Sequence, residues 1–151
     1  MLPEGSKAPD FTLENQEGES VELKDFVGQK LLIWFFPKAN TGGWTTEGQV
    51  FRDEYKKFQE KNTAVIGISA DSTKTQKNFC DKQKFPFSIL SDPEKTIIKA
   101  YKAFGPKKFM GREYDGIYRV SYLIDEAGII LKAYEKVKPK EHAHEVLVDI
   151  S

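Results

Sequence analysis

The stretch Leu31-Leu-Ile-Trp-Phe-Phe-Pro37-Lys-Ala-Asn-Thr41-Gly-Gly-Trp44-Thr-Thr-Glu47 holds the signals that decide the fold of this 151-residue chain. Its apolar part, within residues 30–36, predicts a core strand. The proline, asparagine and glycines that follow predict a tight loop, and a helix begins near Thr45. A strand that leads through a tight loop into a helix N-terminus is a place for a nucleophile, because unpaired backbone N–H groups there stabilise an anion.

The helix after this loop, at about residues 45–61, carries an apolar stripe. Phe51, Tyr55 and Phe58 recur at helical spacing, with Val50 beside them. We interpret the stripe as a face that packs against the core rather than as a cofactor site.

Strands and helices alternate along the rest of the chain. In chain order the pattern predicts a β-hairpin of residues 10–13 and 20–23 around a turn at 16–18, a strand at 64–69, a helix after 71–72 that ends before 86, a strand at 87–90, a helix at about 93–104, a loop at 105–116, strands near 118–125 and 129–136, and a final helix from 140. This order predicts a layered α/β domain. No repeat or linker interrupts it, so we expect one domain over residues 1–151.

The composition excludes several classes of partner. Basic and acidic residues number 23 each, so no net charge attracts nucleic acid or an anionic membrane. The longest apolar run is too short to span a bilayer, and the chain does not open with a basic region followed by an apolar signal core. A single cysteine excludes an internal disulfide framework and fits a reducing compartment. We therefore expect a cytoplasmic protein.

The sequence predicts no cofactor and no metal site. His142 and His144 are two positions apart on a predicted helix, so they point in roughly opposite directions and cannot share a metal without outside ligands. The pair Gly42-Gly43 lacks the Gly-Lys-Ser/Thr ending of a phosphate-binding loop. Lys107 and Lys108 belong to a predicted solvated loop in which acidic residues follow the basic ones.

Motifs along the whole chain resemble those of the peroxiredoxins, and most closely those of the bacterioferritin comigratory (Q-type) subgroup. Besides the loop quoted above, the matching motifs are Gly5-Ser-Lys-Ala-Pro-Asp-Phe-Thr-Leu13, Phe51-Arg-Asp53, Leu90-Ser-Asp-Pro93, Gly116-Ile-Tyr-Arg119 and Leu123-Ile-Asp125. The resemblance implies a thioredoxin-like fold of the peroxiredoxin type, with a central mixed β-sheet, helices on both faces and an N-terminal β-hairpin.

The resemblance also implies roles for individual residues. It places Trp44 at the position of the peroxidatic cysteine, whose thiolate attacks a hydroperoxide, with Pro37 and Thr41 at the family's active-site positions. Arg119 matches the arginine that stabilises the thiolate and the peroxide oxygens, and Cys80 matches the resolving cysteine of some members. The implied partners are a hydroperoxide and a thioredoxin-like reductant, and we expect a monomer or a weak dimer.

Two of these residues also have a purely structural interpretation. Thr41 would be a good helix N-cap, and Arg119 could simply pair with an acid such as Asp53 or Glu47.

Cys80 is the only thiol of the chain, so its surroundings matter. The residues three and four positions away on its helix are all polar, namely Gln76, Lys77, Gln83 and Lys84. This pattern predicts a thiol near the surface whose thiolate the lysines favour. The other interpretation is a small residue packed beside Phe79.

Three functions follow from these residues. Trp44 cannot act as a nucleophile or form a sulfenic acid, so the first is a peroxiredoxin that is inactive or severely impaired. The second is an active thiol peroxidase that works through Cys80, or in which the natural residue 44 is cysteine or selenocysteine, the latter encoded by UGA. The third is a non-enzymatic binding protein on the same fold.

Overall fold

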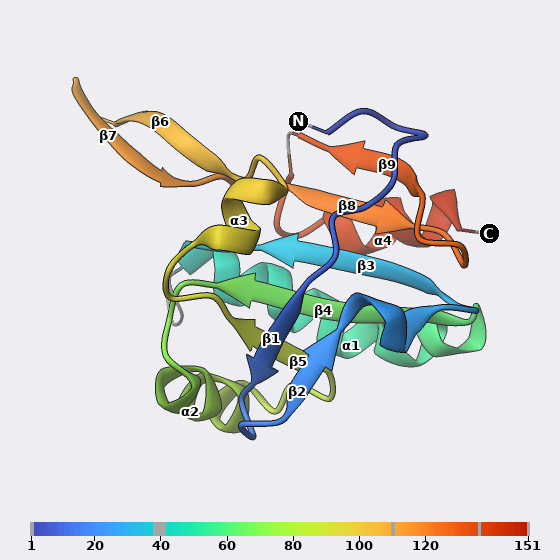
Figure 1. Cartoon of the computed structure of the whole chain (residues 1–151). Coiled ribbons are helices and arrows are strands. Elements are labelled where there is room, and N and C mark those ends of the chain that lie inside the picture. Colours follow the sequence, from blue (N-terminus) through green and yellow to red (C-terminus); the bar gives the residue numbers. More distant parts are fainter. Residues whose placement is uncertain (1, 38–41, 110, 136, 151) are drawn as a thin grey trace.

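A seven-stranded mixed sheet forms the centre of the computed structural model (Figure 1). The structure describes all residues except 1, 38–41, 110, 136 and 151. For residues 42–44 and 109 it describes the backbone but not the side chains. Its strand order is β2-β1-β5-β4-β3-β8-β9. The strands are β1 Thr12–Asn15, β2 Ser20–Glu22, β3 Lys30–Phe35, β4 Thr63–Ser69, β5 Ser88–Ser91, β8 Ser121–Ile124 and β9 Ile130–Tyr134.

The central strand β3 fixes the register of its two neighbours. Ile33 lies opposite Ile66 of the parallel strand β4 and opposite Tyr122 of the antiparallel strand β8. The parallel neighbours β3, β4 and β5 require crossover connections, which the helices between them supply. The sheet is therefore mixed, as the resemblance implies.

One face of the sheet is covered by three helices, α1 (Gly42–Glu60), α2 (Thr73–Gln83) and α4 (His142–Asp149). In Figure 1, α1 and α4 lie behind the strands. Trp34 and Phe36 of β3 and its continuation point to this face, where Trp34 stacks on Phe36 with ring centroids 4.8 Å apart. The stripe predicted on the first helix packs here, with Phe51 and Phe58 fully buried.

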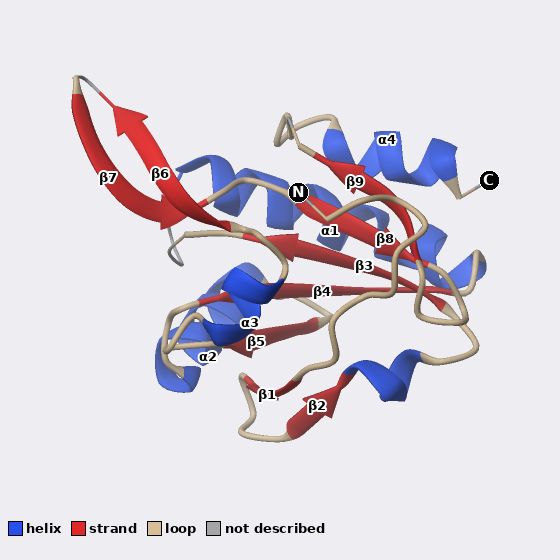
Figure 2. Cartoon of the chain, turned by 45° about the horizontal axis from the view of Figure 1, so that its top comes forward, coloured by secondary structure: helices blue, strands red, loops and turns tan. Residues whose placement is uncertain are grey.

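The other face is covered by the short helix α3 (Thr96–Ala100), the 3-10 helix η1 (Leu23–Phe26) and the N-terminal segment (Figure 2). Leu31, Ile33 and Phe35 point to it, in alternation with the residues of the first face. Helices thus lie on both faces, and β1 and β2 form the expected N-terminal hairpin. The structure describes no helix that is both long enough and apolar enough to cross a membrane.

A second, two-stranded sheet replaces the loop predicted at residues 105–116. It is an antiparallel hairpin of β6 (Phe104–Phe109) and β7 (Arg112–Ile117), which extends away from the body of the molecule in Figures 1 and 2. The helix predicted at 93–104 is also shorter, because the chain leaves α3 at Ala100 and enters β6 at Phe104.

Candidate functional site

The segment predicted as a tight loop lies between the end of β3 at Phe35 and the start of α1 at Gly42, and its residues 38–41 lie outside the described part of the structure. Pro37 stands two residues after β3 and is half-buried. Thr41 lies outside the described residues, so its expected role stays a prediction. Trp44 is in the first turn of α1, and its side chain is likewise outside the described part of the structure.

Arg119 lies in the short segment between β7 and β8 rather than on a strand, and it is half-buried. The next residue, Val120, accepts a hydrogen bond of 3.1 Å from the N–H of Phe35. This bond holds Arg119 beside the end of β3, from which the loop with Pro37 departs. Two segments that are more than 80 residues apart in the sequence therefore meet at one end of the sheet.

Glu47, one turn into α1, is the acid on which Arg119 acts. The residue is only 1% exposed, and burial raises its pKa, against the lowering effect of the Arg119 charge, to about 8. One carboxylate oxygen, Oε2, has no hydrogen-bond partner among the described residues. The alternative acid, Asp53, instead pairs with the Nε atom of Arg52 at 3.0 Å. Of the two acids that the sequence offered, Glu47 is the one coupled to Arg119.

A second cation stands at this end of the sheet. Lys107 of β6 is half-buried, and its Nζ atom donates a 3.0 Å hydrogen bond to the C=O of Ile117. Burial lowers the pKa of Lys107, and the Arg119 charge lowers it further. The expectation of a solvated loop is therefore wrong for Lys107, although the neighbouring Lys108 is exposed.

The predicted surface position of Cys80 is wrong. The residue is 4% exposed and packs in the same core cluster as Phe79, which is the alternative interpretation that the sequence allowed. Burial is the main cause that raises the pKa of the thiol to about 12; Lys77 only opposes it. The polar neighbours of Cys80 gave a wrong prediction because Gln76 is itself buried and donates a hydrogen bond to the C=O of Leu90 at 2.7 Å.

Helices α1 and α2 are joined near Cys80. The Nε2 atom of Gln49 donates to Oε1 of Gln83 at 2.9 Å, and Arg52 donates to the C=O of Gln83 at 2.8 Å. Gln49 stands five positions after Trp44, and Gln83 stands three after Cys80. The helix that begins at the loop and the helix that carries the thiol are thus hydrogen-bonded to each other.

His142 is buried in the core. It is 1% exposed, and its ring makes edge contacts with Phe51 and Tyr134 at centroid distances of 5.7 and 4.8 Å. Its Nδ1 atom lies 3.1 Å from Glu145, and burial is the main cause that lowers its pKa. Among the described residues, no three His, Cys, Asp or Glu side chains gather in a way that would hold a metal ion.

The chain matches the model of the AhpC/TSA family over residues 5–133. It is 41% identical over 143 residues to peroxiredoxin Bcp of Bacillus subtilis, which covers 95% of this chain and 91% of that protein. A structure of a PrxQ variant from Xylella fastidiosa superposes with a TM-score of 0.93 at 32% identity, over 99% of this chain and 96% of that one.

Structures of Xanthomonas campestris peroxiredoxin Q superpose with a TM-score of 0.88 at 33 to 34% identity, over 93% of this chain and 89% of that one. Two of them are variants in which one cysteine, a different one in each, is replaced by serine. Those two cysteines are 36 positions apart. The same interval separates Trp44 from Cys80 in this chain.

Proposed function

The chain belongs to the Bcp or Q-type peroxiredoxins of the AhpC/TSA family, and from this we propose that its site is that of a thiol-dependent hydroperoxide reductase in which Trp44 holds the nucleophile's position. The two cysteines of the Xanthomonas protein are separated by the same 36 positions as Trp44 and Cys80, which supports the assignment of Trp44 to the position of the nucleophile. So does the meeting of Arg119 with the end of β3, beside Pro37.

The chemistry of such a site needs a thiolate at residue 44. The sulfur attacks one oxygen of the hydroperoxide, the O–O bond breaks, and the alkoxide leaves and takes a proton, which gives an alcohol and a sulfenic acid. A second thiol, in the position of Cys80, then attacks the sulfenic sulfur and releases water, which forms a disulfide. A thioredoxin-like dithiol restores both thiols. Arg119 would favour the thiolate and the anion that leaves.

The observation that carries our conclusion is the state of Cys80. Trp44 offers no thiolate, and the one thiol of the chain is buried with a pKa of about 12, so almost none of it is ionised at neutral pH. Cys80 therefore cannot take over the attack on the peroxide. We propose that the chain, with tryptophan at position 44, is inactive or severely impaired as a peroxidase.

Hydrogen peroxide consumption with an excess of a thioredoxin system tests this proposal. We expect the chain with Trp44 to consume no more hydrogen peroxide than the blank, and the Trp44→Cys variant to consume it catalytically. Val27→Cys is the matched control, because Val27 is 68% exposed and lies outside the site. This variant adds a thiol to the chain but does not place it in the site. Turnover by the chain as written that is lost in Cys80→Ser would contradict the proposal, and so would equal activity of the two added cysteines.

The buried carboxyl group of Glu47 beside Arg119 favours a second candidate, in which the natural residue 44 is cysteine or selenocysteine. Burying a carboxyl group is unfavourable for folding, and a buried carboxyl group near Arg119 suits a site that handles an anion. The codon for residue 44 decides between the candidates. A UGA codon would support selenocysteine, whereas UGG would exclude it.

We also propose that the protein works in the cytoplasm on a hydroperoxide and a thioredoxin-like reductant, without nucleic acid or membrane, as a monomer or a weak dimer. The balanced charge and the single reduced cysteine support this assignment.

A further inference from the structure

We propose that Lys107 is a positioning residue of the peroxide site, whose ammonium group acts together with Arg119 to favour an anion at residue 44. The inference rests on the proposed function, which places the reacting atom at that position. It concerns a side chain of the projecting hairpin, to which the sequence assigned no role.

The first step is the direction of the backbone groups at the base of the hairpin. The N–H of Tyr118 donates to the C=O of Ala103 at 2.7 Å. Bonded pairs alternate along an antiparallel ladder, so the pairs 105/116 and 107/114 are bonded across the hairpin. The intervening pairs, 104/117 and 106/115, then direct their N–H and C=O groups outward.

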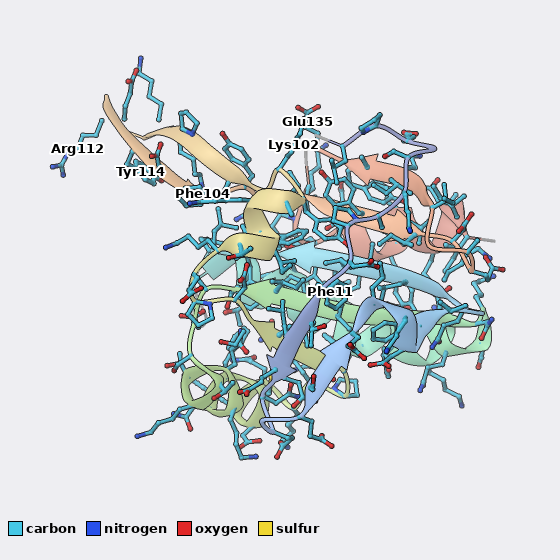
Figure 3. All side chains as sticks on the ribbon, in the orientation of Figure 1. Phe11, Lys102, Phe104, Arg112, Tyr114 and Glu135 are labelled. Atoms are coloured by element: carbon cyan, nitrogen blue, oxygen red, sulfur yellow. The ribbon has the colours of Figure 1, made fainter. Side chains whose placement is uncertain are left out.

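Lys107 uses one of these outward groups to hold a bent conformation. Its stem lies across Gly116, where an added Cβ would stand 2.9 Å from Lys107 Cδ. Its ammonium group reaches back to the outward C=O of Ile117 at 3.0 Å. The charge is thereby held at the base of the hairpin, next to Ile117, which stands two positions before Arg119. Arg112 and Tyr114 extend toward the tip instead (Figure 3).

Tyr118 makes the matching contact on the other strand. Its ring lies across Gly105, where an added Cβ would stand 2.4 Å from the hydroxyl oxygen, and that hydroxyl donates to the outward C=O of Pro106 at 3.0 Å. The two glycines thus allow two long side chains to lie flat against the hairpin. Arg119, which follows Tyr118, is fixed relative to Lys107 by these contacts.

Two cations, Lys107 and Arg119, lie at this base of the hairpin. Lys107 and Arg119 repel each other closely enough that the pKa of Lys107 is lowered. Glu47, the acid that burial and Arg119 influence together, has a pKa of about 8 and is therefore mostly protonated at neutral pH. Lys107 and Arg119 would therefore both favour a thiolate at residue 44.

The test uses the Trp44→Cys, Cys80→Ser chain, in which residue 44 carries the only thiol. The pH dependence of its alkylation rate gives the pKa of that thiol. Lys107→Gln removes the charge but keeps an N–H donor for Ile117, and Lys107→Arg keeps both. Lys108→Gln is the matched control, because it removes the same charge from the adjacent, exposed position on the opposite face of the hairpin.

We expect Lys107→Gln to raise the pKa of the thiol by about half a unit or more, Lys108→Gln to leave it nearly unchanged, and Lys107→Arg to restore it. Equal shifts for the two glutamine variants, no shift for either, or a raised pKa in Lys107→Arg would overturn the inference. The readout does not need peroxide turnover. A failed peroxidase assay in Trp44→Cys would therefore count against the proposed function, while the role of Lys107 is decided separately by the pKa of the thiol.

Discussion

The guanidinium group of Arg119 lowers the pKa of the buried Glu47 carboxyl group, but burial outweighs it, and the pKa settles at about 8. The folded protein therefore binds a proton at Glu47 in a range of pH where the unfolded chain, with an ordinary pKa of 4.5, has already lost it. Stability from this group is present below about pH 4.5 and is lost as the pH rises toward 8.

The first prediction concerns Glu47→Gln, which removes this titration. The free energy of unfolding of the variant, relative to the parent chain, should rise by about 2 to 4 kcal/mol between about pH 5 and pH 9. Urea unfolding at a series of pH values measures the difference. Glu60→Gln, at an exposed position of the same helix, should show no such trend. A difference for Glu47→Gln that is flat with pH would show that the carboxyl group is not buried as described.

The second prediction concerns His142, for which the sign is opposite. Burial lowers its pKa below 6.5, so the folded protein gives up the proton that the unfolded chain holds, and stability is lost as the pH falls through 6.5. His142→Gln should gain stability relative to the parent as the pH falls, by at most about 1.4 kcal/mol per unit. His144→Gln, on the exposed side of α4, is the control. A trend of equal size in both variants would contradict burial as the cause.

The third prediction concerns the thiol of Cys80. With a pKa of about 12 and 4% exposure, it should react with a soluble alkylating reagent at neutral pH about 100-fold more slowly than an exposed thiol. The comparison is the chain with Cys80→Ser and Asn78→Cys, which moves the thiol to an exposed position of the same helix. Unfolding in denaturant should make the two chains react alike. Rapid labelling of native Cys80 would refute its burial.

The fourth prediction concerns Gly48, where α1 approaches the core. An added Cβ would stand 2.5 Å from Phe85 Cζ and 3.1 Å from Trp34, so Gly48→Ala should destabilise by about 1 to 3 kcal/mol although alanine favours helix. In a Phe85→Leu background, which removes the obstructing ring edge, most of that penalty should disappear. If Gly48→Ala stabilises the parent chain instead, the close approach is not as described.

The parts of the fold that the sequence predicted are those with a strong apolar pattern. The run within residues 30–36 and the stripe with Phe51 and Phe58 both mark buried surfaces. The hairpin at 104–117 has no such pattern, because β7 is exposed at residues 112–115 and the segment contains proline and three glycines, which are typical of loops.

The candidate site could be predicted less well, because its critical properties depend on burial. Polar neighbours indicated an exposed Cys80, but the amide of Gln76 is satisfied inside the protein and leaves the thiol covered. Glu47 appeared in the sequence only as one of two possible partners for Arg119. Lys107 could not be selected at all, since only the bend of its side chain over Gly116 separates it from Lys108.

The outward-facing position of Pro106 bears on how the molecule behaves in a concentrated solution. An isolated β-ribbon normally offers free edges on which other chains can add strands and grow into fibrils. Pro106 has no N–H to offer at such an edge, and the outward C=O groups of Pro106 and Ile117 already accept hydrogen bonds from Tyr118 and Lys107. The same contacts that hold Lys107 in place thus blunt the base of the ribbon against cross-β aggregation.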